Sequence, residues 1–329
     1  MSHPLYPANQ MPPPGEAPSA GEGPSAGELL PGGEPLSAGP APDGRGDVES
    51  RVPQTSWPPW MAPVALVAAI VFAAVGGLVI DIPAVALGAK IRGSHVPPGL
   101  EIADTAVQDM AFVFVACFVA TLGGRRVYAW QFGLRPTPLW RAVRLAVGAA
   151  IAFLVFLLIW SAFVQTSKEK LLEQLGTSES TLLLVMSAAL TCVIAPVCEE
   201  FLFRGFIFGS LRNWRGPWPA AVLTGILFGA VHAGSAPAAD LVPLAVLGFA
   251  LCLLYERTGS LYPCIALHAL NNSIAFGSLE GWSVLGVLGL VIASLGTITL
   301  LALALIRSGV IPRRPPVAGP DLQPISAGG

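Results

Sequence analysis

Hydrophobic residues in this chain come in long runs separated by short polar loops, from Trp57 to about position 306. About 20 consecutive apolar residues are enough for a helix to cross a bilayer. We therefore predict eight membrane spans, near residues 60–82, 106–123, 142–164, 181–203, 219–235, 241–256, 261–278 and 283–306. The second span is the weakest because Gln108 and Asp109 lie at its start. The pattern predicts an all-α fold, a polytopic bundle of transmembrane helices.

The overall composition supports a membrane protein. Of the 329 residues, 53% are hydrophobic and only 12% are charged, which is too apolar for an ordinary soluble domain. The net charge of −2 and the lack of a basic stripe indicate no nucleic-acid partner. The five cysteines all lie in apolar runs without a CxxC spacing, so we expect buried, inert thiols.

Residues 1–56 differ from the rest of the chain. They contain twelve prolines and a degenerate six-residue repeat that starts at Gly15, and this composition is typical of a disordered tail. We divide the remainder into N-terminal spans over 57–144, a core over 145–280, a last span over 281–308 and a second disordered tail over 309–329.

The loops predict how the chain is oriented. Arginines crowd the loops after spans two, four, six and eight, whereas the alternate loops carry few basic residues. The positive-inside rule places the arginine-rich loops in the cytoplasm. We therefore expect a multi-pass protein of the cell membrane with both termini cytoplasmic, as an even number of spans requires.

Two adjacent acids, Glu199 and Glu200, lie near the end of the fourth span and are followed one turn later by Arg204. Ionisable groups at membrane depth are costly and mark functional sites. Glu200 and Arg204 have the better orientation for an i,i+4 ion pair, while Glu199 is rotated by about 100° on the helix. We expect Glu200 to neutralise Arg204, which leaves Glu199 free for chemistry.

Two histidines lie in the spans, and each is paired with a residue four positions away. His232 closes a Phe228-x-x-x-His232 motif, and His268 opens His268-x-x-x-Asn272. We expect Glu199 and the two histidines at a similar depth in the bilayer, with His232 about 20 Å and His268 about 12 Å from the cytoplasmic end of its span. The sequence therefore predicts that Glu199, His232, His268 and Asn272 converge on one small polar cavity.

These three motifs, in this order, resemble the CAAX-protease and bacteriocin-processing family, also called Abi, of intramembrane peptidases. The resemblance covers roughly residues 145–280. It implies a helical bundle with a cavity open to the cytosol, and an endopeptidase acting on membrane-associated proteins or peptides. It also implies Glu199 as the first motif acid, His232 and His268 as its partners, and Asn272 as an oxyanion or water ligand.

The chemistry of these residue types agrees with peptide hydrolysis. A desolvated glutamate can act as a base toward water, and a neutral imidazole can relay the proton. His268 and Asn272 could donate to the developing oxyanion. Two histidines and a glutamate are also a credible zinc set, with His232 and His268 as the candidate metal ligands, although no HExxH motif is present. Both schemes stay open, and we expect the metal-free one.

Several polar and aromatic residues in the predicted spans are expected to have structural roles only. We expect Phe201, Phe203, Phe206 and Phe208 to pack or face lipid, Asn271 to serve helix packing, and Asp109 and Glu256 to be interfacial. Intramembrane Glu, Arg and His also mark proton-coupled transporters, although no inverted repeat is evident. A third possibility is a non-catalytic scaffold or bacteriocin-immunity protein on the same fold.

Overall fold

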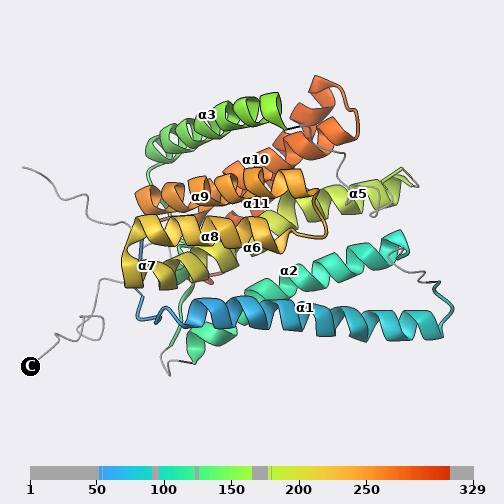
Figure 1. Ribbon diagram of the computed structural model, residues 1–329, viewed down its shortest axis with the longest axis horizontal. Helices are drawn as coiled ribbons and strands as arrows, with labels where there is room; N and C mark the ends of the chain where they lie inside the picture. The colour runs from blue at the N-terminus through green and yellow to red at the C-terminus, as the bar shows by residue number, and fades with distance from the viewer. Residues whose placement is uncertain are drawn as a thin grey trace, which may run out of the picture. The chain divides into compact units, whose positions relative to one another are not determined.

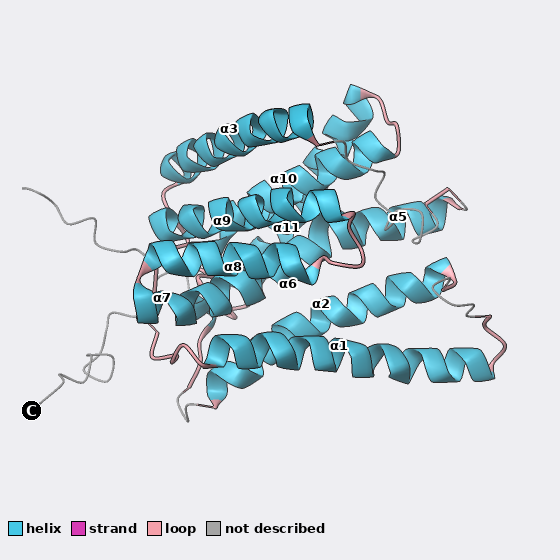
Figure 2. Ribbon diagram, viewed as in Figure 1, coloured by secondary structure: helices cyan, strands magenta, loops and turns pink. Residues whose placement is uncertain are grey.

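The computed structural model describes residues 52–53, 55–90, 96–122, 126–164, 177–178 and 180–311. Within them the chain is built from helices, which confirms the predicted all-α fold (Figure 2). These residues belong to one compact unit, Glu49–Gly329. The two predicted tails fall almost entirely outside the described residues.

All eight predicted spans correspond to helical segments (Figure 1). The helices are α1 (Met61–Ala86), α2 (Pro98–Thr121), η1 (Ala129–Phe132), α3 (Leu139–Phe163), α5 (Thr181–Ala189), η2 (Leu190–Ile194), α6 (Ala195–Glu200), η3 (Phe201–Phe208), α7 (Gly209–Arg215), α8 (Pro217–Val231), η4 (Ala238–Asp240), α9 (Leu241–Thr258), α10 (Leu261–Leu279) and α11 (Val284–Arg307). In the described part of the chain, six helices are long and apolar enough to cross a membrane. The chain is thus a multi-pass membrane protein.

Two predicted boundaries are wrong in ways that affect the site. Proline at the first position starts α2 at Pro98, well before the predicted start, because its ring presets a helical φ and its missing N–H would be unpaired there anyway. Asp109 therefore lies in the middle of α2 and is 1% exposed, so the expectation of an interfacial position was wrong. At the other boundary, α8 ends at Val231, and Gly234 with φ of +112° follows in the turn.

The fourth predicted span is one continuous helix of 35 residues, Thr181–Arg215. Ser180 caps its start by accepting a hydrogen bond from the Leu183 N–H. Two stretches, η2 and η3, are π-helical and flank the Glu199-Glu200 pair. Pro196 lies in the turn after η2 and cannot donate a backbone hydrogen bond, which disfavours a regular α-helical ladder there.

Helices α8 and α9 pack side by side at close range (Figure 1). A Cβ atom added at Gly229 would lie 2.5 Å from the Leu241 carbonyl oxygen, and one at Gly225 would lie 2.7 Å from that of Ala245. One at Gly248 would lie 2.9 Å from the Phe228 Cβ. The absence of a side chain at these three glycines is what lets the two helices approach so closely.

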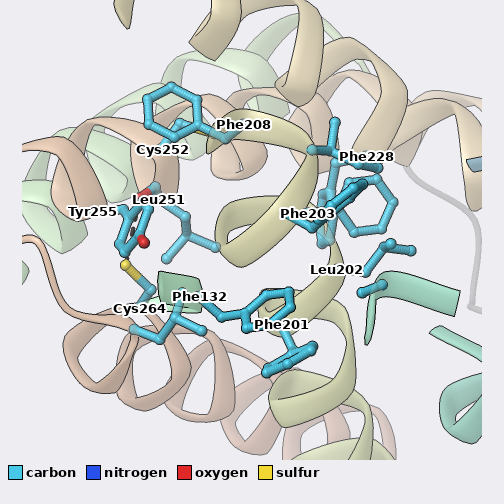
Figure 3. Packing of buried hydrophobic residues seen from close by; sticks show 14 of the residues in the cluster. Phe132, Phe201, Leu202, Phe203, Phe208, Phe228, Leu251, Cys252, Tyr255 and Cys264 are labelled. Atoms are coloured by element: carbon cyan, nitrogen blue, oxygen red, sulfur yellow. Dashed lines mark hydrogen bonds between the residues drawn. The ribbon is translucent and has the colours of Figure 1, made fainter. Parts of the chain in front are cut away.

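Aromatic side chains fill the core around η3 (Figure 3). Phe201, Phe203, Phe206 and Phe208 are all buried, which confirms their packing role. The Phe201 ring stacks on Phe132 of η1 at 4.4 Å between centroids. Buried neighbours on both sides of η3 hold the Glu199–Arg204 segment in place.

Candidate active site

Glu200 and Arg204 form the buried ion pair that their spacing predicts. Arg204 Nη1 lies 2.8 Å from Glu200 Oε1, and both side chains are fully buried. Arg204 Nη2 donates to the Gly248 carbonyl of α9 at 3.1 Å, and the guanidinium lies 4.4 Å from the centroid of the Phe228 ring of α8. Arg204 therefore links η3 to both α8 and α9, with its charge balanced by Glu200.

His268 of α10 joins this pair. Its Nδ1 lies 2.8 Å from Glu200 Oε1, the same oxygen that accepts from Arg204. A carboxylate oxygen that accepts from a guanidinium also accepts from the imidazole, so Nδ1 carries the proton. In the neutral ring the His268 Nε2 is then an acceptor.

His232 is oriented in the same way by the backbone. Its Nδ1 lies 2.7 Å from the Phe228 carbonyl oxygen, one turn earlier in α8. A carbonyl can only accept, so Nδ1 must donate and Nε2 is left with its lone pair in the neutral ring. His232 caps the C-terminal end of α8 and keeps 24% of its side chain exposed.

Glu199 lies between the two imidazoles. Its Oε2 is 3.8 Å from His268 Nε2 and 4.0 Å from His232 Nε2, and it has no hydrogen-bond partner. With both rings neutral and Glu199 ionised, three acceptor atoms face one another. Such a cluster is favourable only with a proton or a donor between its members.

The hydrogen bonds of Asn272 join it to residues outside this cluster. Its Nδ2 donates to the Thr191 carbonyl at 3.0 Å, and its Oδ1 accepts from Asn271 at 3.3 Å. In η2 the Ala195 N–H reaches back five residues to Leu190, so the next donor in this pattern would be the N–H that Pro196 lacks. Asn272 fills that gap at Thr191, and its predicted oxyanion role stays a prediction.

Comparison with known proteins places all six candidate residues in one matched segment. Residues 181–274 match the family model described as type II CAAX prenyl endopeptidase Rce1-like. The resemblance to the CAAX-protease family is confirmed.

Two curated bacterial proteins are similar to part of this chain. Putative membrane peptidase YdiL of Bacillus subtilis (strain 168) is 31% identical over 81 residues, covering 25% of this chain and 32% of that protein. UPF0177 protein YxdF of Lactococcus lactis subsp. lactis (strain IL1403) is 31% identical over 80 residues, covering 24% and 42%. The chain thus matches less than half the length of either relative. No solved structure matches it significantly.

Two pockets of the structure lie away from the predicted site. The larger, of about 430 Å³, lies where the start of α1 meets α7 and α8, and the smaller, of about 90 Å³, lies at the turn from α7 to α8. Neither is lined by Glu199, His232 or His268. The side chains of the cluster pack closely, and only His232 is substantially exposed.

The donor geometry does not fit a three-ligand metal site. Glu199 Oε2 and the two Nε2 atoms are chemically suitable ligands, each imidazole being oriented through Nδ1. Across the described His, Cys, Asp and Glu residues, however, no group of three is arranged to hold a metal ion. Metal binding by His232 and His268 stays a prediction, and the chemistry proposed below uses the side chains and water.

The structure brings two further residues, Phe228 and Asp109, to the site. The Phe228 ring lies between Arg204 and both imidazoles, at 5.0 Å from the His232 ring and 5.6 Å from the His268 ring. Its spacing from His232 was visible, but its contacts with Arg204 and His268 depend on tertiary packing. Asp109 is the other, and its burial could have been suspected from a lone carboxylate inside an apolar run.

Proposed function

We propose that this chain is an intramembrane endopeptidase in which Glu199 activates water for attack on a peptide bond. The observation that carries this proposal is the placement of Glu199 Oε2 at 3.8 and 4.0 Å from two imidazole Nε2 atoms. Membership of the matched segment in a peptidase family supports the reaction class.

The proposed reaction starts with one water held between Glu199 and the imidazoles. When a water is at hydrogen-bond distance from two atoms about 4 Å apart, the angle at the water oxygen between them is roughly 90°. Glu199 removes one proton while the water oxygen bonds to the scissile carbonyl carbon. The carbon–nitrogen bond then breaks, and the proton passes to the leaving amine.

The two histidines hold and move protons in this scheme. Because each Nδ1 is committed to a fixed acceptor, each Nε2 points toward Glu199 as a proton acceptor. An imidazole that has received a proton there becomes a donor to the tetrahedral oxygen. One such donor contributes about 3 kcal/mol to transition-state stabilisation in other hydrolases.

Glu200 and Arg204 position the reacting groups. Glu200 fixes the tautomer and orientation of His268, and Arg204 fixes Glu200. We propose membrane-associated proteins or peptides as substrates, membrane lipids as the surrounding partner, and a cytoplasmic location for both termini. The matched family is described as a CAAX prenyl endopeptidase, and the proposal for this chain does not require a prenyl group on the substrate.

Cleavage profiling tests the proposal. Membranes from cells that express the chain are compared with membranes carrying Glu199→Gln, and new protein termini are identified by mass spectrometry. We expect cleavage products that depend on Glu199 and on His268. Identical termini in both samples, across lipid-embedded and detergent preparations, would contradict the proposal and favour a transporter or scaffold.

A further inference from the structure

Asp109 is a second buried carboxyl group beside the proposed base. It lies in the middle of α2, is 1% exposed, and its Oδ2 has no hydrogen-bond partner. No hydrogen bond or ion pair between Asp109 and a cationic side chain is found in the described part of the chain. A buried, ionised and unpaired carboxylate is strongly unfavourable, so this side chain needs an explanation.

The packing of α2 places Asp109 next to Glu199. Helix α2 runs in the same direction as the Thr181–Arg215 helix and packs against α6 and η3 (Figure 1). Phe112, one turn after Asp109, makes an edge contact with Phe203, one turn after Glu199, at 6.3 Å between ring centroids. With the next turns in contact, Asp109 and Glu199 share one level of the interface, close enough for their charges to interact.

Among the residues that the structure describes, no cationic side chain pairs with either of these two carboxyl groups. Arg204 is held by Glu200 and the Gly248 carbonyl. From α6, the only other ionisable group near Asp109 is the buried thiol of Cys198. On α1, Asp81 interacts instead with Asp104 and Glu101, further toward the start of α2.

We propose that Asp109 is a positioning residue, protonated and neutral, that donates a hydrogen bond to Glu199 directly or through one water. Two adjacent carboxyl groups without a cation cannot both ionise in an apolar interior, so one proton serves the pair. The donated bond leaves Glu199 as the ionised base and aims its Oε2 at the imidazoles. This inference rests on the proposed function only for its catalytic consequence.

Infrared spectroscopy tests the shared proton without any substrate. The purified chain in lipid should show a protonated carboxylic C=O stretch that shifts on exchange into D₂O. We expect Asp109→Asn to remove this band and Glu199→Gln to shift it. A band unchanged by both substitutions, or no band beyond those of the Asp81–Asp104 cluster, would overturn the proposal.

Kinetics then test the positioning role. Asp109→Leu should lower kcat at least tenfold with KM little changed, while thermal stability is kept because leucine has a similar volume and suits the apolar α2 interface. Asp109→Asn keeps a donor and should restore most of the lost kcat. Gln108→Leu, at an exposed neighbouring position, is the matched control and should leave kcat unchanged.

The outcomes separate this inference from the proposed function. If the band responds to both substitutions but no cleavage is detected, the shared proton stands and the peptidase assignment fails. If cleavage depends on Glu199 while Asp109→Leu retains the original kcat, the positioning role is wrong. Parallel losses of kcat and stability in both Asp109 variants would also refute it, since they would show a purely structural side chain.

Discussion

At the scale of single residues, adjacent acids have separate environments. Glu200 is fully buried and accepts from Arg204 and His268 through one oxygen. Glu199 is 9% exposed, and its Oε2 faces the two imidazoles without a hydrogen bond. One helical step therefore separates a side chain committed to structure from one available for reaction.

Substitutions of the two acids should have different consequences. Glu199→Gln should lower turnover by at least about 100-fold while stability is kept, because its amide can donate to an Nε2 lone pair. Glu200→Gln should lower the free energy of unfolding by about 3–5 kcal/mol, because it leaves Arg204 buried without its counter-charge. Cleavage assays and thermal unfolding in detergent check both. Equal losses of stability in the two variants would refute this division.

Chelation tests whether a metal takes part. If Glu199 and the imidazoles activate water directly, prolonged incubation with a chelator should leave turnover unchanged. If zinc is required, chelation removes activity, stoichiometric zinc restores it, and His232→Ala loses both metal and turnover. We expect the first result; about one zinc per purified chain, with activity following its removal and return, would show the metal-free scheme to be wrong.

At the scale of helices, the long Thr181–Arg215 helix departs from α-helical geometry on both sides of Glu199. Short π-helical segments are frequent at functional sites. Here the Thr191 carbonyl lacks a backbone donor because of Pro196, and Asn272 supplies the missing bond from α10. A residue expected to assist catalysis is thereby also a link between two helices.

A double-mutant cycle measures this link. Asn272→Ala should lower the free energy of unfolding by about 1–3 kcal/mol, because it leaves the Thr191 carbonyl unsatisfied. In a Pro196→Ala background the new N–H can reach that carbonyl, so Asn272→Ala should cost less. Unfolding is measured in detergent for the four proteins. Additive effects would show that the two residues do not share this acceptor.

A second prediction at the scale of helices follows from the close contact between α8 and α9. Gly229→Ala places a methyl group against the Leu241 carbonyl and should lower the free energy of unfolding by about 1–3 kcal/mol. Gly289→Ala in α11 meets nothing within 4 Å and serves as the matched control. Equal stability of the two variants would indicate that the contact is looser than described.

At the scale of the whole molecule, the membrane helices differ in length. Helix α8 has 15 residues and is only about 22 Å long, whereas α1 has 26 residues. His232, at the end of α8, therefore lies well short of the level that α1 reaches. The proposed site is consequently at membrane depth if the turn between α7 and α8 lies at one surface.

Cysteine labelling tests the proposed orientation. In a Cys117→Ala background, which removes the exposed native thiol, Leu87→Cys and Arg215→Cys place single reporters in opposite loops. A membrane-impermeant maleimide should label the former in intact cells and the latter only after permeabilisation. Labelling of Arg215→Cys in intact cells would reverse the orientation and with it the cytoplasmic termini.

The sequence alone determined the helical membrane fold and the pairing of Glu200 with Arg204. In a membrane, a long apolar run can pair all its backbone N–H and C=O groups by forming a helix. The i,i+4 spacing pairs Glu200 with Arg204 on any such helix. Only the tertiary structure decided that Asp109 is buried beside Glu199, that His268 shares the Glu200 oxygen, and that Asn272 bonds to Thr191. Each of these depends on which helix faces are in contact and at which level. Local periodicity does not encode that register.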